Sequence, residues 1–332
     1  MADLYLQQSR NRKMTILLFA GFFAFVAAVG LAADVYVNGT LPYGRVPFIF
    51  IFAVCAGGVN GLASYFYGVN LVIASLGASE LDINNPAHRL LHNVAVEMAL
   101  ASGMPMPKLY VIKDPSPNAF AAGRGPGDAV IGVTQGLLET MNREELQAVV
   151  AHEMGHIKAR DILTMTVAAV LLGTVALISD WAIRAWWYAG RAGAIGGSKK
   201  GKGLHPLILV AIGIFIILSP LISRIIALAV SRNREYQADV SSAEFTRNPL
   251  ALASALEKIS GYGAPTRAAR RGTAHLFIFD PLMRKVDNRE GLFADILATH
   301  PPIGKRLDRL YKMAHVYSIP RSGSRRGAPE AK

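Results

Sequence analysis

Two histidines, His152 and His156, stand four residues apart, a spacing that places both imidazoles on one face of a helix. Imidazoles placed in this way can bind the same metal ion. Glu153 lies one step around the helix, beside the coordination position that stays open for water. The pattern His-Glu-Met-Gly-His therefore predicts metal-dependent hydrolysis with Glu153 as the acid–base group. Histidine pairs at this spacing also occur on solvated helix faces, so the motif alone leaves a structural interpretation open.

The residues before the motif favour a helix. Asn142, followed three residues later by Glu145, is typical of a capping box, which would begin the helix near Arg143. Apolar residues then supply a buried face: Leu146, Val149, Val150 and Ala151. The metal motif would fall in the third turn of this helix.

A catalytic zinc site needs a third protein ligand, and the downstream segment 231–239 (Ser-Arg-Asn-Arg-Glu-Tyr-Gln-Ala-Asp) offers one. Glu235 and Asp239 are four residues apart and share a helical face. Glu235 would bind the metal, and Asp239 would orient a ligand or form a hydrogen bond near the site. On spacing alone, a charged helix end just outside a membrane is the simpler explanation of these residues.

Four elements, taken in order, resemble the HtpX-type membrane metallopeptidases, which are relatives of the CAAX prenyl proteases. They are the HEMGH helix, a membrane hairpin, the SRNREYQAD segment and the sequence THPPIGKRL at 299–307. The resemblance extends from the first hydrophobic span to about Tyr311. It implies a zincin-like (gluzincin) metalloprotease domain that binds one zinc ion per chain.

The resemblance also implies roles for individual residues. His152, His156 and Glu235 would be the zinc ligands, and Glu153 would be the catalytic carboxylate. Three further residues match family positions in or near the site: Asp239, His300 and Arg306. The first is expected to orient a ligating histidine, and the other two are expected to lie near the substrate and the metal.

A small sheet is expected before the metal helix, as in zincins. Strands are predicted near 108–112, 118–123 and 129–133, after a helix over 86–102. In the family, the strand that contains Asn118, Ala119, Phe120 and Ala121 corresponds to the edge on which peptide substrate lies. An extended peptide can pair with such an edge through its main chain, without a fixed sequence. Without the resemblance, a purely structural hairpin explains these residues equally well.

The composition is too apolar for a soluble protein of this size, because 52% of the 332 residues are hydrophobic and 17% are charged. Four apolar runs have about the length needed to span a bilayer, at about 14–33, 47–75, 162–178 and 207–230. The first run is longer than a typical signal-peptide core, which favours an uncleaved anchor over a cleaved signal peptide. We therefore expect an integral membrane protein with an α+β, mostly helical fold and about four transmembrane helices.

Basic residues before the first run would keep that end in the cytoplasm, and two spans then return the chain to the cytoplasm. The predicted divisions are a membrane region at 1–76, a protease half at 77–161, a membrane hairpin at 162–230, a second protease half at 231–320 and a disordered basic tail at 321–332. Basic residues between the two later runs oppose this orientation. Either the first two spans set the orientation of the whole chain, or the hairpin does not cross the bilayer completely. We favour a hairpin that crosses the bilayer. The resemblance implies a prokaryotic inner-membrane protein with a cytoplasmic active site.

The predicted function is zinc-dependent cleavage of misfolded or membrane proteins, in membrane-protein quality control, and this biological role rests on the resemblance. The expected partners are protein substrates and membrane lipids. A net charge of +12 could suggest nucleic acid, but attraction of arginines to anionic lipid headgroups is the simpler account. One alternative is a CAAX-type processing protease, whose known members are longer. The other is a transporter or scaffold with a structural metal, which would place ionisable residues inside its spans.

Overall fold

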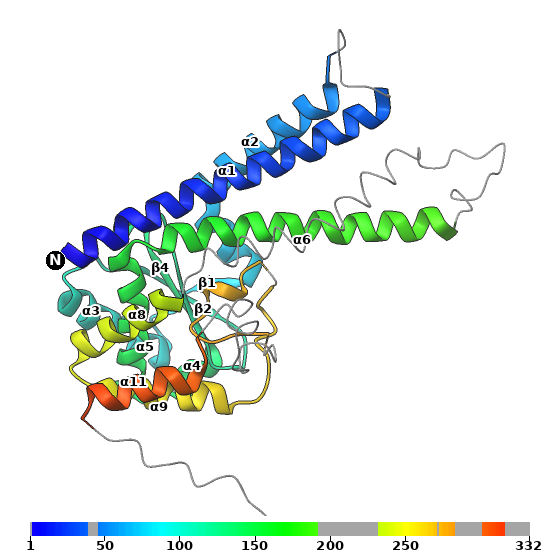
Figure 1. Ribbon diagram of the computed structural model, residues 1–332. Helices are drawn as coiled ribbons and strands as arrows, with labels where there is room; N and C mark the ends of the chain where they lie inside the picture. Colours follow the sequence, from blue (N-terminus) through cyan, green and yellow to red (C-terminus); the bar gives the residue numbers. More distant parts are fainter. Residues whose placement is uncertain (1, 39–45, 192–231, 271, 283–300, 316–332) are drawn as a thin grey trace, which may run out of the picture.

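The computed structural model describes residues 2–38, 46–191, 232–270, 272–282 and 301–315. A globular part with a small sheet lies at one end of the molecule, and three long helices extend from it (Figure 1). The fold is α+β and mostly helical, as the sequence predicts.

The three long helices are α1 (Ala2–Asn38), α2 (Phe48–Leu76) and α6 (Ile162–Arg191). Each contains a stretch long and apolar enough to cross a membrane, at Gln8–Val35, Phe48–Leu76 and Ile162–Asp180. Three of the predicted spans thus coincide with helices that are long and apolar enough to cross a membrane. The first begins earlier than expected, because its helix runs unbroken through the basic residues ahead of the apolar run. The fourth predicted run at 207–230, the basic loop before it and the predicted tail at 321–332 lie outside the described residues.

Small residues bring α2 close to its neighbours. Gly61 faces α1, and a Cβ there would lie 3.4 Å from the ring of Phe23. Gly68 faces α6, and a Cβ there would lie 2.9 Å from the methyl group of Thr166. Glycine at these two positions therefore allows the membrane helices to pack closely.

Four strands form the sheet, in the order β1-β2-β4-β3. Their bounds are β1 Ala78–Glu80, β2 Lys108–Ile112, β3 Ala119–Ala122 and β4 Val130–Thr134. β2 and β4 are parallel, and the other two neighbouring pairs are antiparallel. Three strands match the predicted ones, whereas β1 escapes the prediction because it is only three residues long and follows closely on the end of α2. β3 lies at an edge of the sheet, where the substrate strand is expected.

The sheet is buried on both faces. The shorter helices are α3 (Pro86–Ser102), α4 (Gln135–Thr140), α5 (Arg143–Ala159), α8 (Arg232–Thr246), α9 (Pro249–Gly261) and α11 (Ile303–Met313), with the 3₁₀ turns η1 (Pro126–Asp128) and η2 (Ala274–Leu276). One face of the sheet, with Ile131 and Val133, packs against α3, α5 and α9. The other face, with Phe120 and Val130, packs against the ends of α2 and α6. Because the first core also includes Leu307 of α11, described residues from both predicted protease halves build one core.

The bounds of α5 follow from local signals. Asn142 Oδ1 accepts a hydrogen bond from Glu145 N at 2.9 Å, and the Glu145 carboxylate accepts one from Asn142 N at 2.9 Å, which confirms the capping box. At the other end, Arg160 adopts a φ of 54°, in the left-handed region, and closes the helix. Only Arg160 and Asp161 separate α5 from α6.

The first turns of α1 lie against the end of α5. Gln8 Nε2 donates a hydrogen bond to the Lys158 carbonyl, and Asn11 Nδ2 donates one to the Ala159 carbonyl, both at 3.1 Å. The beginning of α1 and the metal helix therefore lie at the same end of the membrane helices (Figure 1).

Candidate metal centre and active site

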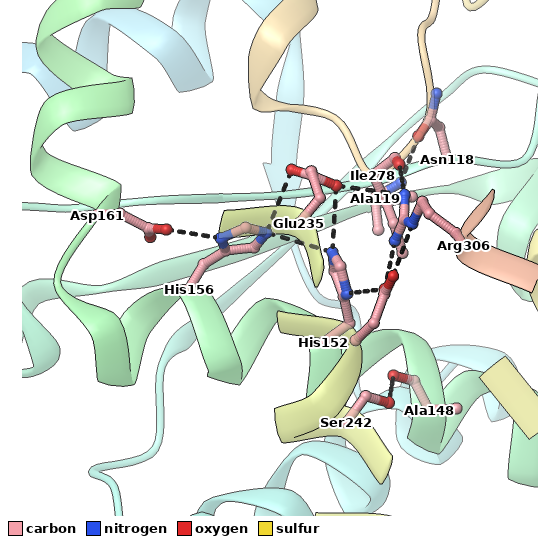
Figure 2. Close-up of polar contacts among 11 residues, drawn as sticks. Asn118, Ala119, Ala148, His152, His156, Asp161, Glu235, Ser242, Ile278 and Arg306 are labelled. Carbon is pink, nitrogen blue, oxygen red and sulfur yellow. Dashed lines mark hydrogen bonds and ion pairs between the residues drawn. The ribbon is translucent and has the colours of Figure 1, made fainter. Parts of the chain in front are cut away.

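α5 and α8 bring three donor side chains together: His152, His156 and Glu235 (Figure 2). The Nε2 atoms of the two histidines are 3.2 Å apart. Glu235 Oε1 lies 3.7 Å from Nε2 of His156, and its Oε2 lies 3.8 Å from Nε2 of His152. All three side chains are buried, at 0%, 4% and 2% exposed. The three predicted ligands thus meet at one point.

α8 can approach α5 this closely because Gly155 faces it. A Cβ on Gly155 would lie 2.9 Å from the Cβ of Ser241 and 3.1 Å from the Cα of Ala238. A second contact joins the same two helices, since Ser242 Oγ donates to the Ala148 carbonyl at 2.7 Å. The glycine of the HEMGH motif therefore helps to position Glu235, the predicted third ligand, which α8 carries.

The other ring nitrogen of each histidine faces a carboxylate. His152 Nδ1 lies 3.0 Å from Asp239 Oδ1, and His156 Nδ1 lies 3.0 Å from Asp161 Oδ2. The His156–Asp161 contact is a hydrogen bond, whereas His152 and Asp239 lie close together without hydrogen-bond geometry. A carboxylate beside Nδ1 favours the hydrogen on that nitrogen and leaves the lone pair of Nε2 for a metal. Asp239 thus lies where the sequence predicts it. Asp161 is a residue that sequence reasoning missed, because its only signal is an acidic side chain just after the helix, which the turn at Arg160 brings back to the ring.

Arg306 is buried beside the cluster, in agreement with its predicted place. Its Nε and Nη2 donate to the two carboxylate oxygens of Asp239, at 2.9 and 2.6 Å. Its Nη1 lies 3.2 Å from Glu235 Oε2 and donates to the Ile278 carbonyl at 2.8 Å. Arg306 therefore orients Asp239 and, through it, a histidine ring. His300, which the sequence also assigns to this site, lies outside the described residues.

Glu153 is 1% exposed, and neither of its carboxylate oxygens has a hydrogen-bond partner among the described residues. Burial raises the pKa of Glu153 to about 8, with His156 opposing the shift and Glu235 adding to it. A buried carboxylate without a partner is unfavourable in a purely structural site. Its position and raised pKa are typical of a group that exchanges a proton with a reactant.

The charges around the cluster favour a cation at its centre. Burial lowers the pKa of His156, but three neighbouring carboxylates, Asp161 foremost, raise it to about 10. Burial lowers the pKa of His152, against the raising effect of Asp239. Burial also raises the pKa of Asp239, but Arg306 and His152 bring it below its ordinary value. The site therefore holds an ionised Asp239 beside one ligating ring, and carboxylates that favour positive charge beside the other ring.

The donor set fits a divalent metal ion. With hydrogens on both Nδ1 atoms, the two Nε2 atoms direct lone pairs toward each other and toward a carboxylate, which is repulsive unless a cation lies among them. Ligand atoms that bind zinc at about 2.1 Å in a tetrahedron are about 3.4 Å apart, close to the separations in this cluster. Two imidazoles and one carboxylate also form a known ligand set of catalytic zinc sites, which keep a fourth position open.

The predicted substrate residues lie at the outer edge of the sheet, and the chain itself covers that edge. All four are buried, at 0–2% exposed: Asn118, Ala119, Phe120 and Ala121. Ile278 N donates to the Ala119 carbonyl at 2.9 Å, and Phe120 forms an antiparallel bridge with Phe277. The edge strand therefore exists as predicted, but a peptide could not pair with it in this arrangement.

A small sheet, a metal helix and three converging ligands, joined to membrane-spanning helices, define a membrane metalloprotease. The sequence model of Peptidase family M48 matches residues 86–314, and the chain belongs to this peptidase family. The predicted resemblance is confirmed, and membership in a peptidase family excludes the transporter or scaffold alternative. The protein is thus a metalloprotease that acts on protein substrates and uses a metal cofactor.

Several curated relatives are similar over nearly their whole length. A Protease HtpX homolog from Caldanaerobacter subterraneus subsp. tengcongensis is 42% identical, with 92% of this chain and 97% of the relative covered. Relatives of the same name from Limosilactobacillus reuteri and Streptococcus gordonii are 36% and 37% identical, and each match covers 93% of this chain and 100% of the relative. A crystal structure of Ste24p from S. mikatae is 18% identical, with a TM-score of 0.49, and the match covers 93% of this chain and 67% of that chain.

Proposed function

We propose that the protein is a zinc-dependent integral-membrane endopeptidase in which His152, His156 and Glu235 bind zinc and Glu153 is the general base. One observation carries the proposal. Two Nε2 atoms and a carboxylate oxygen converge within 4.8 Å of one another, while Nδ1 of each histidine faces a second carboxylate. Glu153 lies between the two histidines on the same helix and is buried without a hydrogen-bond partner among the described residues, which supports its catalytic role.

Zinc at this site would supply a Lewis acid for the scissile carbonyl and for the attacking water. Glu153 would accept a proton from that water and deliver it to the leaving amine. Its pKa of about 8 supports the second transfer, because a carboxyl group that can hold a proton near neutral pH can also donate it. Asp239 and Asp161 would keep the two imidazoles oriented, and Arg306 would hold Asp239 in place.

The proposed substrate is an extended stretch of a misfolded or membrane protein that pairs with β3 through Asn118, Ala119, Phe120 and Ala121. Main-chain pairing requires no fixed sequence, which suits a protease with a quality-control role. The membrane-spanning part of α6 begins only a few residues after His156, so cleavage would take place close to the membrane surface.

We place the active site on the cytoplasmic side of a prokaryotic inner membrane. The first turns of α1 contact the end of α5, which puts the basic residues Arg10, Arg12 and Lys13 on the same side of the membrane as the metal centre. Basic residues at the end of a span favour the cytoplasmic side for that end. The protease would then comprise 77–161 and 231–320, whose described residues share one core, and the membrane part would comprise 1–76 and 162–230.

The test compares wild type, Glu153→Gln and Glu144→Gln, purified in detergent and reconstituted with zinc. Glu144→Gln is a matched control, because Glu144 lies on the same helix but is exposed. Zinc per chain and cleavage of casein are measured for all three. We expect Glu153→Gln to retain zinc and lose cleavage, and Glu144→Gln to keep both. Equal cleavage by wild type and Glu153→Gln would exclude Glu153 as the base, and an absence of bound zinc in all three would exclude zinc as the cofactor.

A further inference from the structure

Residues 274–280, which we call the covering segment, run along the outer edge of β3. Ile278 N donates to the Ala119 carbonyl at 2.9 Å, and Asn118 Nδ2 donates to the Phe279 carbonyl at 3.1 Å. Phe277 forms an antiparallel bridge with Phe120. These contacts use main-chain atoms of the covering segment in an antiparallel arrangement, which is how an added peptide strand pairs with a sheet edge.

The covering segment also reaches the metal centre. The Ile278 carbonyl accepts a hydrogen bond from Arg306 Nη1 at 2.8 Å, and that nitrogen lies 3.2 Å from Glu235 Oε2 (Figure 2). One guanidinium nitrogen therefore separates a main-chain carbonyl of the covering segment from a proposed zinc ligand. A substrate carbonyl must lie in this same neighbourhood to be cleaved.

The side chains of the covering segment are buried against β3. Leu276, Phe277 and Ile278 are 2%, 1% and 2% exposed. The rings of Phe277 and Phe120 lie 5.6 Å apart, between centroids. Together with the burial of the zinc ligands, this leaves β3 without an open edge for a peptide. In this arrangement the protease is therefore closed to a peptide at β3.

The covering segment pairs with β3 over a much shorter stretch than β4 does. It forms one β-bridge with β3, whereas β3 pairs with β4 over four residues, from Ala119 to Ala122. On its other side the covering segment contacts a membrane helix, since His275 Nε2 donates to the Met165 carbonyl of α6 at 2.9 Å. The covering segment is thus the partner that can leave the edge while the sheet stays intact.

We propose that the covering segment is an internal pseudosubstrate, which holds the protease closed until a substrate peptide replaces it on β3. The inference rests on the proposed function, because it takes β3 as the substrate edge. Once Ile278 leaves, Arg306 Nη1 can donate to a carbonyl of the incoming peptide. The space vacated by Leu276 and Phe277 then accepts apolar side chains, so peptides with large apolar residues at these positions bind best.

The first test locks the covering segment in place. Residues that face each other in this way across antiparallel strands have Cα atoms about 5.5 Å apart, within the range for a disulfide. Ala119→Cys is combined with Ile278→Cys in a Cys55→Ser background, and casein cleavage is measured before and after a phosphine reductant. We expect the oxidised form to cleave at least roughly tenfold more slowly than the reduced form. The two single-cysteine variants are matched controls, and the reductant should not change their rates.

The second test needs no catalysis. Hydrogen exchange of residues 274–280 is measured in Glu153→Gln, with and without a β-casein peptide at a concentration that saturates binding by fluorescence anisotropy. We expect the amides of the covering segment to exchange faster when the peptide is bound, because it takes their place on β3. Failure of the peptide to bind, or unchanged exchange with the peptide bound, would contradict the inference.

The two tests separate this inference from the proposed function. If the oxidised double-cysteine variant cleaves casein as fast as the reduced form, the pseudosubstrate is excluded while the protease function stands. If wild type and the reduced variant both fail to cleave, the proposed function is in question instead. The exchange measurement on Glu153→Gln then decides the inference by itself.

Discussion

His156 Nδ1 and Asp161 Oδ2 lie 3.0 Å apart across the two-residue turn that joins α5 to α6. His156 is a proposed zinc ligand, and Asp161 directly precedes a membrane-spanning helix. The contact therefore ties the orientation of a metal ligand to the point where the chain enters the membrane. A shift of α6 relative to α5 would change the hydrogen bonding of this imidazole.

Replacement of Asp161 by Asn should weaken zinc binding roughly 10- to 100-fold, because the carboxylate that fixes the tautomer and orientation of His156 is lost. Competition with a chelator measures the zinc affinity of the full-length protein in detergent. Asp128→Asn is the matched control, since Asp128 pairs with Arg124 at the surface. An unchanged affinity in Asp161→Asn would show that the contact does not support the metal.

Arg306→Lys should destabilise the protein and weaken its metal binding. Lysine cannot form the two hydrogen bonds that Arg306 makes with Asp239, and it leaves a buried carboxylate poorly paired. Breaking a buried ion pair in this way costs about 3–5 kcal/mol of stability. Thermal unfolding and zinc content are compared with those of Lys305→Arg, an exposed position on the same helix. Equal melting temperatures for the two variants would argue against this role for Arg306.

Gly155→Ala tests whether the close approach of α8 to α5 positions Glu235, the proposed third ligand. Alanine favours a helix over glycine by up to about 1 kcal/mol, so on propensity alone the variant should be more stable. We expect the opposite, a loss of roughly 1–3 kcal/mol together with weaker zinc binding, because the new Cβ would press on Ser241 and Ala238 of α8. Gly304→Ala is the control, since a Cβ there meets nothing within 4 Å. A more stable Gly155→Ala with full zinc affinity would contradict the prediction.

Glu145 should make the stability of the globular part depend on pH. Burial raises its pKa, but hydrogen bonds from Lys258, Ser254 and Asn142 bring it below the ordinary value of 4.5. A lowered pKa in the folded state means that the ionised group stabilises the protein above pH 4.5, and that this contribution is lost as the pH falls through the folded-state value.

The difference in melting temperature between wild type and Glu145→Gln should therefore be largest near neutral pH and should shrink as the solution becomes more acid. Thermal unfolding in detergent across this range measures it. Glu144→Gln, one position earlier and exposed, should show little difference at any pH. A constant difference for Glu145→Gln would mean that packing, rather than charge, explains the effect of the substitution.

Local patterns in the sequence determined the positions of several helices and the spacing of the two histidines. Three apolar runs form helices that are long and apolar enough to cross a membrane, and the sequence could predict them because the length and composition of a run are properties of contiguous residues. Asn142 and Glu145 began α5 because a capping box involves only one turn of helix. The spacing of His152 and His156 places both rings on one helix face, because residues four apart are separated by about one turn. Arg306 could be assigned to the site only through a family motif.

The tertiary structure alone decided how these local elements combine. Glu235 joins the histidines because α8 packs on Gly155, and no pattern within either helix shows which residues face each other. Phe277 covers Phe120 through main-chain pairing, which leaves no signature in side-chain type or spacing. The proposed ligands and the proposed substrate strand can therefore be predicted from motifs in the order of the residues. Whether the site is open or closed depends on contacts between residues far apart in the chain, which only folding brings together.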